Sequence, residues 1–572
     1  MKRHTLDSLA NGWQRQGLSR RDLLRLAAAG AGGATIGGFE TAGRATAQDA
    51  ATPATGAENP FGEAQKKGGT YVVVVAAGGG YPQVFRPETY YGSLVFWACK
   101  LMYTPLILLD RAWNQMTPGL ATSWEWSSDF KQLTAHLRQG VTFHDGAPFT
   151  ARDVEFTYKL MVRKETNPSV PDVTIFEGGQ EYKDRATEEF AGVTVIDDYT
   201  VRFNLTSPSS VFLLNVTNTG IVPAHGFPED ALTNDQDIDS LAFFLEQPFG
   251  TGPFKLTSFD LQTNITFEAF PDYWKGAPNL DGIVFRLDVP GPAMISGLKA
   301  GEYDGAYVGM MADADALRDV SNLNLDANYS LANEQIFIAA TEKPELSVPV
   351  RQALRVALDV ETLDATVGYG FPRPAPSTMM HPSLIPNPTL PSLDYDPERA
   401  KQLLQEGNWD PSRTLVLGAS AAQGGAPSNF HAAIMEMWKA VGLDVEFKPF
   451  DPANQIEDWS ANPHEFDVYQ TSYAWLAYDP STTYGDQSCE RSAYTHYCNP
   501  TYDQTMQAAI REGDAEKAAE LYKQAQTILT TDLPYIPIWI EPEIWGIQKT
   551  VHGGNLGRGP LNDVQAELWW KE

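Results

Sequence analysis

The stretch "LATSWEWSSDFKQLTAHLRQGVTFHDGAPFTARDVEFTY", from Leu120 to Tyr158, shows the patterns of a strand, a turn and a helix in succession. Apolar and polar residues alternate from Leu133 to Arg138, which is typical of a half-buried strand. The residues "HDGAP", His144 to Pro148, interrupt this alternation with Asp-Gly and Pro, which favour a turn. Thr150 and the aspartate three residues later resemble a capping box and predict a helix through Met161. The stretch therefore predicts a mixed α/β fold.

His144 and Asp145 within this stretch could form a catalytic or metal-binding pair. The end of the strand and the turn account for both residues, and no second cluster of ligands has the spacing of a metal site. The motifs G-x-S-x-G and H-E-x-x-H are absent, and the nine histidines are scattered along the chain. We therefore expect no catalytic residue, no metal and no cofactor. A secreted hydrolase stays a distant alternative, because paired carboxylates can meet in three dimensions.

Composition and charge narrow the class of protein further. With 572 residues the chain is too long for one core, and 43% hydrophobic residues are ample for packed domains. The formal net charge of -30 argues against nucleic-acid binding, since a phosphate backbone attracts a basic surface. No run of 18 apolar residues follows the N-terminal region, so no membrane span is expected there.

The N-terminal region has the features of an export signal. In "LSRRDLLRLAAAGAGGATIGG" the pair Arg20-Arg21 precedes a weakly apolar stretch, and small residues follow up to Ala47. This pattern predicts a signal peptide over residues 1–47 and resembles a twin-arginine signal, which implies a periplasmic or other extracytoplasmic location. Residues 48–65 are rich in Ala, Pro, Thr and Gly and predict a flexible tether.

The chain contains three cysteines with different expected roles. Cys489 and Cys498 are close in sequence, and in an oxidising compartment they are expected to form a disulfide. Cys99 lies in the apolar stretch "LVFWACKLMY" and is expected to be a buried free thiol.

A series of motifs over about 450 residues resembles the extracytoplasmic solute-binding proteins of ABC importers, in the oligopeptide- and dipeptide-binding family (family 5). Besides the opening stretch they are "GVTVIDDYTVRFNLTSPSSVFL" (192–213), "FGTGPFKLTSF" (249–259), "FPDYWKGAPNLDGIVFRL" (270–287), "LKAGEYDGAYV" (298–308), "VRQALRVALDVETL" (350–363), "DPERAKQLLQEGNW" (396–409) and "YCNPTYDQTM" (497–506). They occur in the order of the family.

The resemblance implies two α/β lobes joined by two hinge strands, with an extra subdomain. By analogy, lobe I would comprise residues 66–108, 211–333 and 535–572, the subdomain residues 109–210, and lobe II residues 334–534. The periodicity of the residues agrees with α/β units. Apolar residues on one face of 350–358 and of 434–441 predict amphipathic helices, and "GLDVEFKPF" predicts a strand after the second.

The implied function is ligand capture without chemistry. A monomer would bind short peptides in a cleft between the lobes, close around them, and deliver them to the permease subunits of a membrane transporter. Oligosaccharides are an alternative, because exposed Trp and Tyr stack on sugar rings. Chelated nickel, an opine or another small solute is a further alternative, as is a role for a sensor or chaperone instead of an importer.

The resemblance places the ligand at "TSYAWLAYDPSTTY", residues 471–484. Trp475 matches the aromatic position of the family. In peptide binders a nearby acid meets the peptide's α-amino group; here Asp479 stands one position later than that acid, and this departure puts the peptide assignment in doubt. Tyr473 and Tyr478 complete an aromatic cluster that could equally belong to the core.

Four residues outside that segment are further candidates for the ligand site. The run "TYVVVVAA" predicts a buried strand ending near Ala77, and ligands of α/β sheets bind beyond the carboxyl ends of strands, so Gly80 and Tyr81 are expected at the edge of the cleft. Arg373 could bind a ligand carboxylate or be a solvated loop residue. Thr251 could offer a hydroxyl contact or only form part of a turn.

Overall fold

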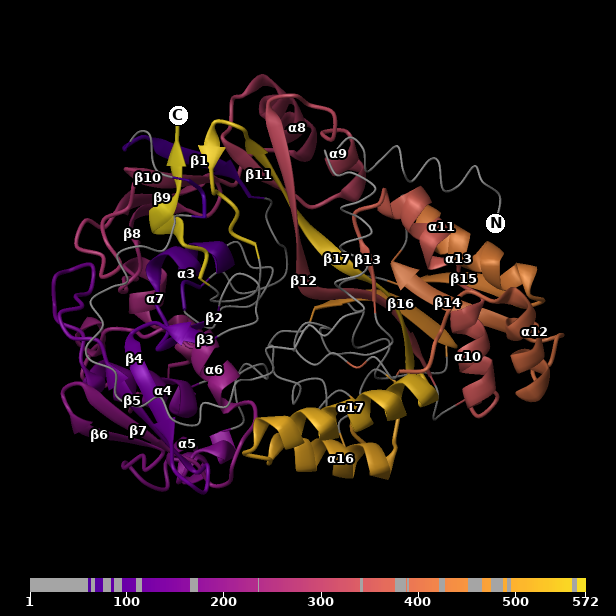
Figure 1. Cartoon of the computed structure of the whole chain (residues 1–572), viewed down its shortest axis with the longest axis horizontal. Coiled ribbons are helices and arrows are strands. Elements are labelled where there is room, and N and C mark those ends of the chain that lie inside the picture. Colours follow the sequence, from indigo (N-terminus) through magenta and orange to yellow (C-terminus); the bar gives the residue numbers. More distant parts are fainter. Residues whose placement is uncertain are drawn as a thin grey trace, which may run out of the picture. The chain divides into compact units, whose positions relative to one another are not determined.

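The computed structural model describes the greater part of the chain after the first 59 residues (Figure 1). The described residues are 60–62, 67–75, 84–86, 95–109, 116–164, 173–234, 236–339, 343–375, 387, 390–420, 427–450, 465–474, 487–490, 495–557 and 563–572; the side chains of residues 96, 330–334 and 472–474 are not described. The predicted signal peptide and most of the predicted tether lie outside these residues.

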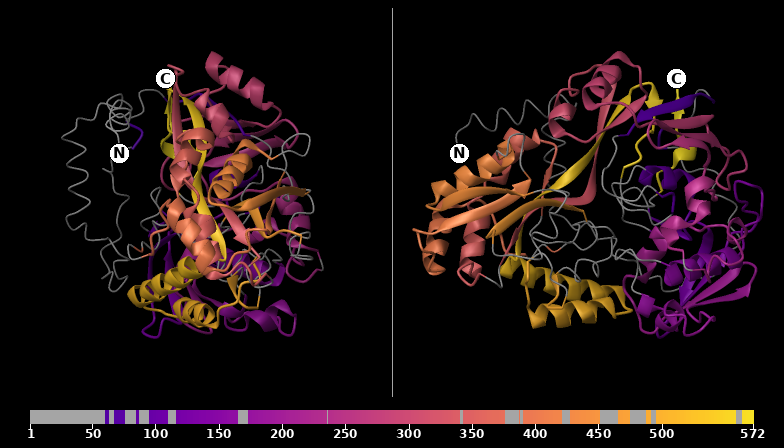
Figure 2. Two further views of the ribbon diagram at one scale, coloured as in Figure 1. Left: turned by 90° about the vertical axis from the view of Figure 1, so that its right-hand side faces the viewer. Right: turned by 180° about the vertical axis from the view of Figure 1, so that it is seen from behind.

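One mixed sheet of 11 strands forms the centre of the fold. One half contains β1 (Thr70–Val74), β8 (Phe254–Asp260), β9 (Asn264–Ala269), β10 (Gly282–Arg286) and β11 (Gly305–Val308). The other half contains β13 (Arg373–Pro374), β14 (Thr414–Ser420), β15 (Asp444–Phe450) and β16 (Val468–Ala474). Two long antiparallel strands, β12 (Leu323–Ile338) and β17 (Tyr535–Gln548), belong to both halves. Figures 1 and 2 show these two strands running from β11 to β16.

A second, antiparallel sheet has the order β4-β5-β7-β6. Its strands are β4 (Ala121–Trp126), β5 (Gln132–Leu137), β6 (Val193–Asp197) and β7 (Thr200–Asn204). Two short pairs complete the strands: β2 (Ile107–Leu109) with β3 (Met116–Pro118), and β18 (Val551–His552) with β19 (Trp570–Lys571).

Helices cover both sheets. Before β12 they are α3 (Phe96–Met102), α4 (Ala151–Lys164), α5 (Gly179–Lys183), α6 (Phe212–Asn218), α7 (Ala242–Glu246), α8 (Gly291–Ala300) and α9 (Met311–Asp315). After β12 they are α10 (Val348–Val356), α11 (Val360–Leu363), α12 (Pro397–Glu406), α13 (Asn429–Ala440), α16 (Pro500–Ile510) and α17 (Ala515–Asp532). The two predicted amphipathic helices are α10 and α13, and the strand predicted after them is β15. The α/β class is confirmed.

The opening stretch folds as its pattern predicts, with one difference. The alternating residues form β5, and the backbone N–H of Thr150 donates to Oδ2 of Asp153 at 2.8 Å, which is one of the two hydrogen bonds of a capping box; the N–H of Asp153 donates to the backbone carbonyl oxygen of Thr150 instead of its hydroxyl. The described part of the helix continues to Lys164, three residues beyond the predicted end. Its last residues are held by carbonyl oxygens: Lys164 donates to the backbone of Asn234 at 2.8 Å, and Arg163 to that of Thr187 at 3.3 Å. Cations suit the C-terminal end of a helix.

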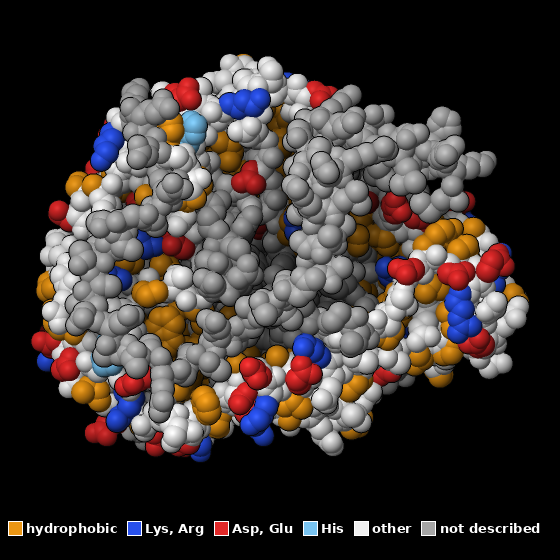
Figure 3. Space-filling view, in the orientation of Figure 1, with side chains coloured by type: hydrophobic (Ala, Val, Ile, Leu, Met, Phe, Trp, Pro, Cys, Tyr) orange, Lys and Arg blue, Asp and Glu red, His pale blue; other side chains and the backbone are white. Residues whose placement is uncertain are grey.

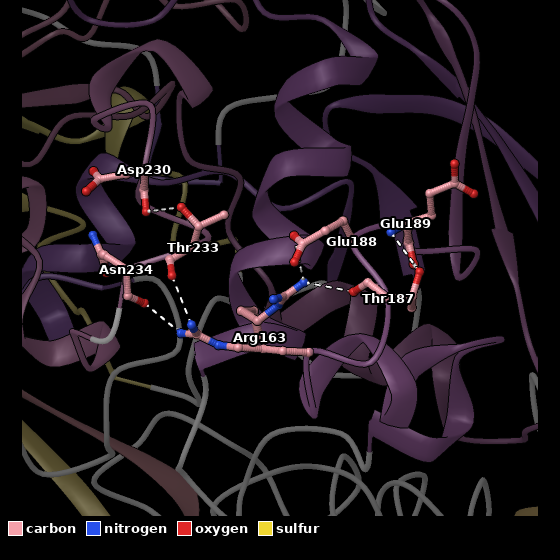
Figure 4. Close-up of polar contacts among 8 residues, drawn as sticks. Arg163, Thr187, Glu188, Glu189, Asp230, Thr233 and Asn234 are labelled. Carbon is pink, nitrogen blue, oxygen red and sulfur yellow. Dashed lines mark hydrogen bonds and ion pairs between the residues drawn. The ribbon is translucent and has the colours of Figure 1, made fainter.

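These cations attach the four-stranded sheet and its helices to the loop of residues 230–236. Arg185 donates to the carbonyl oxygens of Thr233 at 2.9 Å and Asn234 at 2.8 Å, and Arg163 pairs with Glu188 at 3.6 Å. Figure 4 shows these contacts side by side. These polar contacts add to apolar packing, because Leu160 of α4 and Ala231 of the loop belong to the same core cluster.

Helices α16 and α17 form an antiparallel pair with one apolar and one charged face. Ala518, Tyr522, Ala525 and Leu529 of α17 are buried, whereas Lys523 and Glu520 are paired with each other near the surface at 2.6 Å. Figure 3 shows acidic and basic side chains interspersed over this part of the surface. The charged face is therefore solvated, and the apolar face packs inward.

The three cysteines occupy the predicted states. A disulfide joins Cys489 to Cys498, and Cys99 is a buried free thiol. Among the residues that the structure describes, no helix is long and apolar enough to cross a membrane.

The strand pairing bears on the predicted lobe boundaries without settling them. The boundary predicted between residues 333 and 334 falls inside β12, where the pairing with β17 shifts in register. Strand β17 also pairs with both halves of the sheet, and Phe371, from the predicted lobe II, packs in a core cluster with Val74 and Leu298. The boundaries themselves stay a prediction.

Candidate functional site

His144 and Asp145 have structural contacts in the loop that follows β5. The ring of His144 lies against the loop of Gly250 and Gly252: Nδ1 accepts from the N–H of Gly250 at 3.3 Å, and Nε2 donates to the carbonyl oxygen of Gly252 at 2.9 Å. Burial lowers the pKa of His144 to about 4, so the imidazole is neutral at pH 7. Asp145 pairs with His225 at 2.7 Å. His144 therefore acts as a clamp within the fold, as the turn prediction implies.

Thr251 lies in the clamped loop and is fully buried. A Cβ on Gly250 would lie 2.3 Å from the carbonyl oxygen of Met102, and a Cβ on Gly252 would lie 2.3 Å from that of Leu101. The two glycines are therefore required by the close approach of the loop to the end of α3. The hydroxyl of Thr251 has no hydrogen-bond partner in the described part of the chain. A ligand contact for Thr251 stays a prediction.

Two other predicted site residues occupy one row across four strands. Arg373 of β13 is opposite Ile540 of β17, Ile540 is opposite Asn333 of β12, and Asn333 is opposite Tyr473 of β16. Neighbouring strands lie about 5 Å apart, so the Cα atoms of Arg373 and Tyr473 are separated by about 15 Å. We call these four positions the crossing row. It lies where both long strands pass from one half of the sheet to the other.

The guanidinium group of Arg373 is exposed and held in place by an aromatic ring. It lies 3.6 Å from the centre of the Tyr329 ring, and the Tyr329 hydroxyl donates to the carbonyl oxygen of Phe371 at 2.9 Å. Phe371 is buried in the core. Within the described ranges no carboxylate pairs with Arg373, so its charge is available to an anionic group.

Strand β16 leads directly into the segment predicted to hold the ligand. The described strand runs to Ala474, and Trp475 is two residues after Tyr473 of the crossing row in the sequence. Trp475, Tyr478 and Asp479 lie outside the described residues, as do Gly80, Tyr81 and the predicted strand end at Ala77; the described strand β1 ends at Val74. Of Tyr473 only the backbone is described.

The structure adds two residues near the crossing row that the sequence did not single out. Tyr329 supports Arg373, and Gln335 of β12 is fully buried, with neither amide atom hydrogen-bonded to any residue in the described ranges. No sequence signal marks either residue, because both are ordinary strand residues whose partners come from distant segments. In the described part of the chain, no group of three or more His, Cys, Asp or Glu could hold a metal ion.

Comparison with known proteins gives consistent results. Residues 115–494 match the family model described as "Bacterial extracellular solute-binding proteins, family 5 Middle". Di/tripeptide-binding protein 1 of Pseudomonas aeruginosa (strain UCBPP-PA14) is 29% identical over 510 residues, which cover 84% of this chain and 91% of that protein.

Two solved structures show the same fold. The ABC transporter substrate-binding protein CtaP from Listeria monocytogenes has a TM-score of 0.76 at 22% identity, covering 88% of this chain and 100% of its own. The periplasmic binding protein DppA from Helicobacter pylori, in complex with the peptide STSA, has a TM-score of 0.66 at 21% identity, covering 89% and 99%. The predicted two-lobed fold is thereby confirmed.

Proposed function

The chain belongs to the bacterial extracellular solute-binding proteins of family 5, and from this premise we propose that it captures short peptides and delivers them to the permease subunits of an ABC importer. The ligand would lie between the two lobes and be released to the transporter after the lobes open. A protein that binds a ligand with both lobes is shifted toward its closed state by that ligand.

The observation that supports a short peptide is the crossing row. It carries a cation at Arg373, and its other end, Tyr473 about 15 Å away, precedes the segment of Trp475 and Asp479 in the sequence. An extended peptide of three or four residues spans about 10–14 Å. The row thus offers Arg373 to the ligand carboxylate, while Asp479 would bind the α-amino group through a charge-assisted hydrogen bond. The aromatic residues Tyr473 and Tyr478 would flank the peptide.

We further propose that the two lobes have the boundaries predicted from the resemblance and hinge at the crossing row. The register of β12 and β17 changes between Tyr329 and Asn333, and again between Glu334 and Gln335. Irregular pairing frees the backbone from a continuous ladder, which is where a hinge can absorb changes in φ and ψ.

Export by the twin-arginine route is also part of the proposal, with Arg20-Arg21 as its signal. Replacing both residues by Lys (Arg20→Lys, Arg21→Lys) should retain the full-length protein in the cytoplasm, as followed by cell fractionation. Export of this variant at the wild-type level would assign the signal to another route.

The test of the ligand is native mass spectrometry of the protein from Gln48 onward, before and after mild denaturation. Released masses that fit short peptides, and binding of added Ala-Ala, Ala-Ala-Ala or Ser-Thr-Ser-Ala, are expected. A discrete sugar or metal-chelate mass, with no peptide binding, would overturn the peptide proposal and leave the family assignment intact. Turnover of a bound compound would instead favour the secreted hydrolase.

Arg373→Met tests the role of the cation in the same assay. It should weaken binding of trialanine roughly tenfold or more, because a charge-assisted hydrogen bond is lost. C-terminally amidated trialanine should bind the wild type and the variant about equally. An equal loss for both peptides would mean that Arg373 only supports the loop.

A further inference from the structure

Gln335 has a buried side chain whose hydrogen-bonding capacity is entirely unused. Its exposure is 0%, and neither its amide oxygen nor its amide nitrogen has a hydrogen-bond partner among the residues that the structure describes. A buried amide without partners costs the free energy of its lost hydration, about 1–3 kcal/mol. Such a group in a native fold therefore calls for a partner that the described part of the chain does not provide.

The position of Gln335 is close to the proposed ligand. It lies in β12 two residues after Asn333 of the crossing row, which corresponds to about 7 Å along the strand. On one side it is opposite Thr471 of β16, two residues before Tyr473, and on the other side opposite Pro537 of β17. Pro537 has no N–H to donate.

A second glutamine on the neighbouring strand shows how the chain satisfies a buried amide that is purely structural. Gln470 of β16 is opposite Ile336 and therefore faces the other side of the sheet from Gln335. Its amide oxygen is hydrogen-bonded to Nε2 of His431, which the capping box of α13 holds in place. The contrast is between two buried amides on adjacent strands, one with a side-chain partner and one without.

We propose that the side-chain amide of Gln335 binds a peptide unit of the ligand, donating to its carbonyl oxygen and accepting from its N–H. This inference rests on the proposed function and names a residue that would recognise the peptide bond itself. A primary amide carries one acceptor and two donors, which are complementary to the groups of a backbone peptide. The contact would also explain why an unsatisfied amide is kept where an apolar side chain would be more stable in the absence of ligand.

The experiment compares wild type, Gln335→Met and the matched control Gln470→Met. Isothermal titration with trialanine and Ser-Thr-Ser-Ala gives the affinities, and thermal unfolding of the ligand-free proteins gives Tm. Gln335→Met should weaken peptide binding roughly tenfold and raise Tm, because an unpaired buried amide is removed. Gln470→Met should lower Tm, since His431 loses its partner, and leave the affinity unchanged.

Two depsipeptide analogues of trialanine, each with one amide N–H replaced by an ester oxygen, identify the contact directly. One analogue should bind wild type more weakly than trialanine does. Gln335→Met should bind that analogue and trialanine with about equal affinity, since coupled groups give non-additive losses. If wild type binds the peptides but Gln335→Met keeps the wild-type affinity or lowers Tm, the inference about Gln335 is wrong and the proposed function stands. If wild type binds none of these peptides, the proposed function fails and the inference with it.

Discussion

At the scale of single residues, His144 shows how a conspicuous polar side chain can be entirely structural. Its neutral ring donates through one nitrogen and accepts through the other, both to the backbone of the loop at Gly250 and Gly252. A protonated ring could not accept from the N–H of Gly250. The clamp therefore depends on the neutral state of His144, which burial favours.

This dependence predicts a loss of stability in mild acid. The pKa of His144 is about 4 in the folded protein and about 6.5 when the chain is unfolded, so only the unfolded chain binds a proton between these values. The contribution is present in full above pH 6.5 and falls by about 1.4 kcal/mol per pH unit as the pH drops to about 4. Urea unfolding midpoints at pH 7, 6, 5 and 4.5 measure it.

The control for this prediction is His144→Gln. The variant should be less stable than wild type at pH 7 because the clamp is imperfect, and the difference should shrink toward pH 4.5. Carboxylates elsewhere contribute equally to both proteins. A constant difference at all four pH values would show that His144 does not titrate in the unfolding reaction.

At the scale of elements, the disulfide cross-links a short segment whose C-terminal side is already held by hydrogen bonds to α17. Tyr497 and Asn499 flank Cys498, and both donate to Oδ2 of Asp532 at the end of α17, at 2.6 Å and 2.8 Å. The other cysteine, Cys489, is joined to this anchored point over a sequence separation of 9. The bridge mainly restricts the unfolded chain.

Removing the bridge with Cys489→Ser and Cys498→Ser together should lower the free energy of unfolding by about 2–3 kcal/mol in the chain-entropy model for a short loop. Denaturant unfolding of both proteins, with and without dithiothreitol, measures this loss. Reductant should lower the stability of wild type to that of the variant and leave the variant itself unchanged. A response of the variant to reductant would contradict the assignment, since Cys99 is a single buried thiol.

At the scale of the whole molecule, the helix pair α16–α17 meets residues from the first half of the chain. The hydroxyl of Ser210 donates to the carbonyl oxygen of Ala509 at 2.9 Å and lies 2.8 Å from the hydroxyl of Tyr522. Val211 and Leu214 belong to the same core cluster as residues of both helices. In the proposed division, Ser210 is the last residue of the extra subdomain, Val211 and Leu214 belong to lobe I, and both helices belong to lobe II, so closing of the lobes would bring these residues together.

If closing of the proposed lobes forms this contact, it contributes to ligand affinity. We expect Tyr522→Phe to weaken trialanine binding about two- to tenfold, the value of one ordinary hydrogen bond, with little change in the Tm of the ligand-free protein. The matched control is Tyr497→Phe, whose hydroxyl bonds to Asp532 inside the proposed lobe II. That control should lower Tm and leave the affinity unchanged. If Tyr522→Phe instead lowers Tm and leaves the affinity unchanged, the Ser210–Tyr522 contact is present with and without ligand.

Local features of the fold could be predicted from the sequence because they depend on residues close in the chain. The start of α4, where the N–H of Thr150 donates to Asp153, the amphipathic face of α10 and the pairing of Cys489 with Cys498 all involve short separations. Helix α4 continues beyond its predicted end at Met161, and Lys164 there is held by Asn234, 70 residues away. Local periodicity contains no information on such a partner.

The sequence by itself determined the family and the order of strands and helices, since its motifs follow one another along the chain. Only the tertiary structure decided which strands are neighbours, and therefore that Arg373, Ile540, Asn333 and Tyr473 share one row. The same holds for Gln335, whose unused amide is evident only once Thr471 and Pro537 lie beside it. The physical reason is that strand pairing and hydrogen-bond satisfaction are set by segments far apart in the chain, whose register no local pattern specifies.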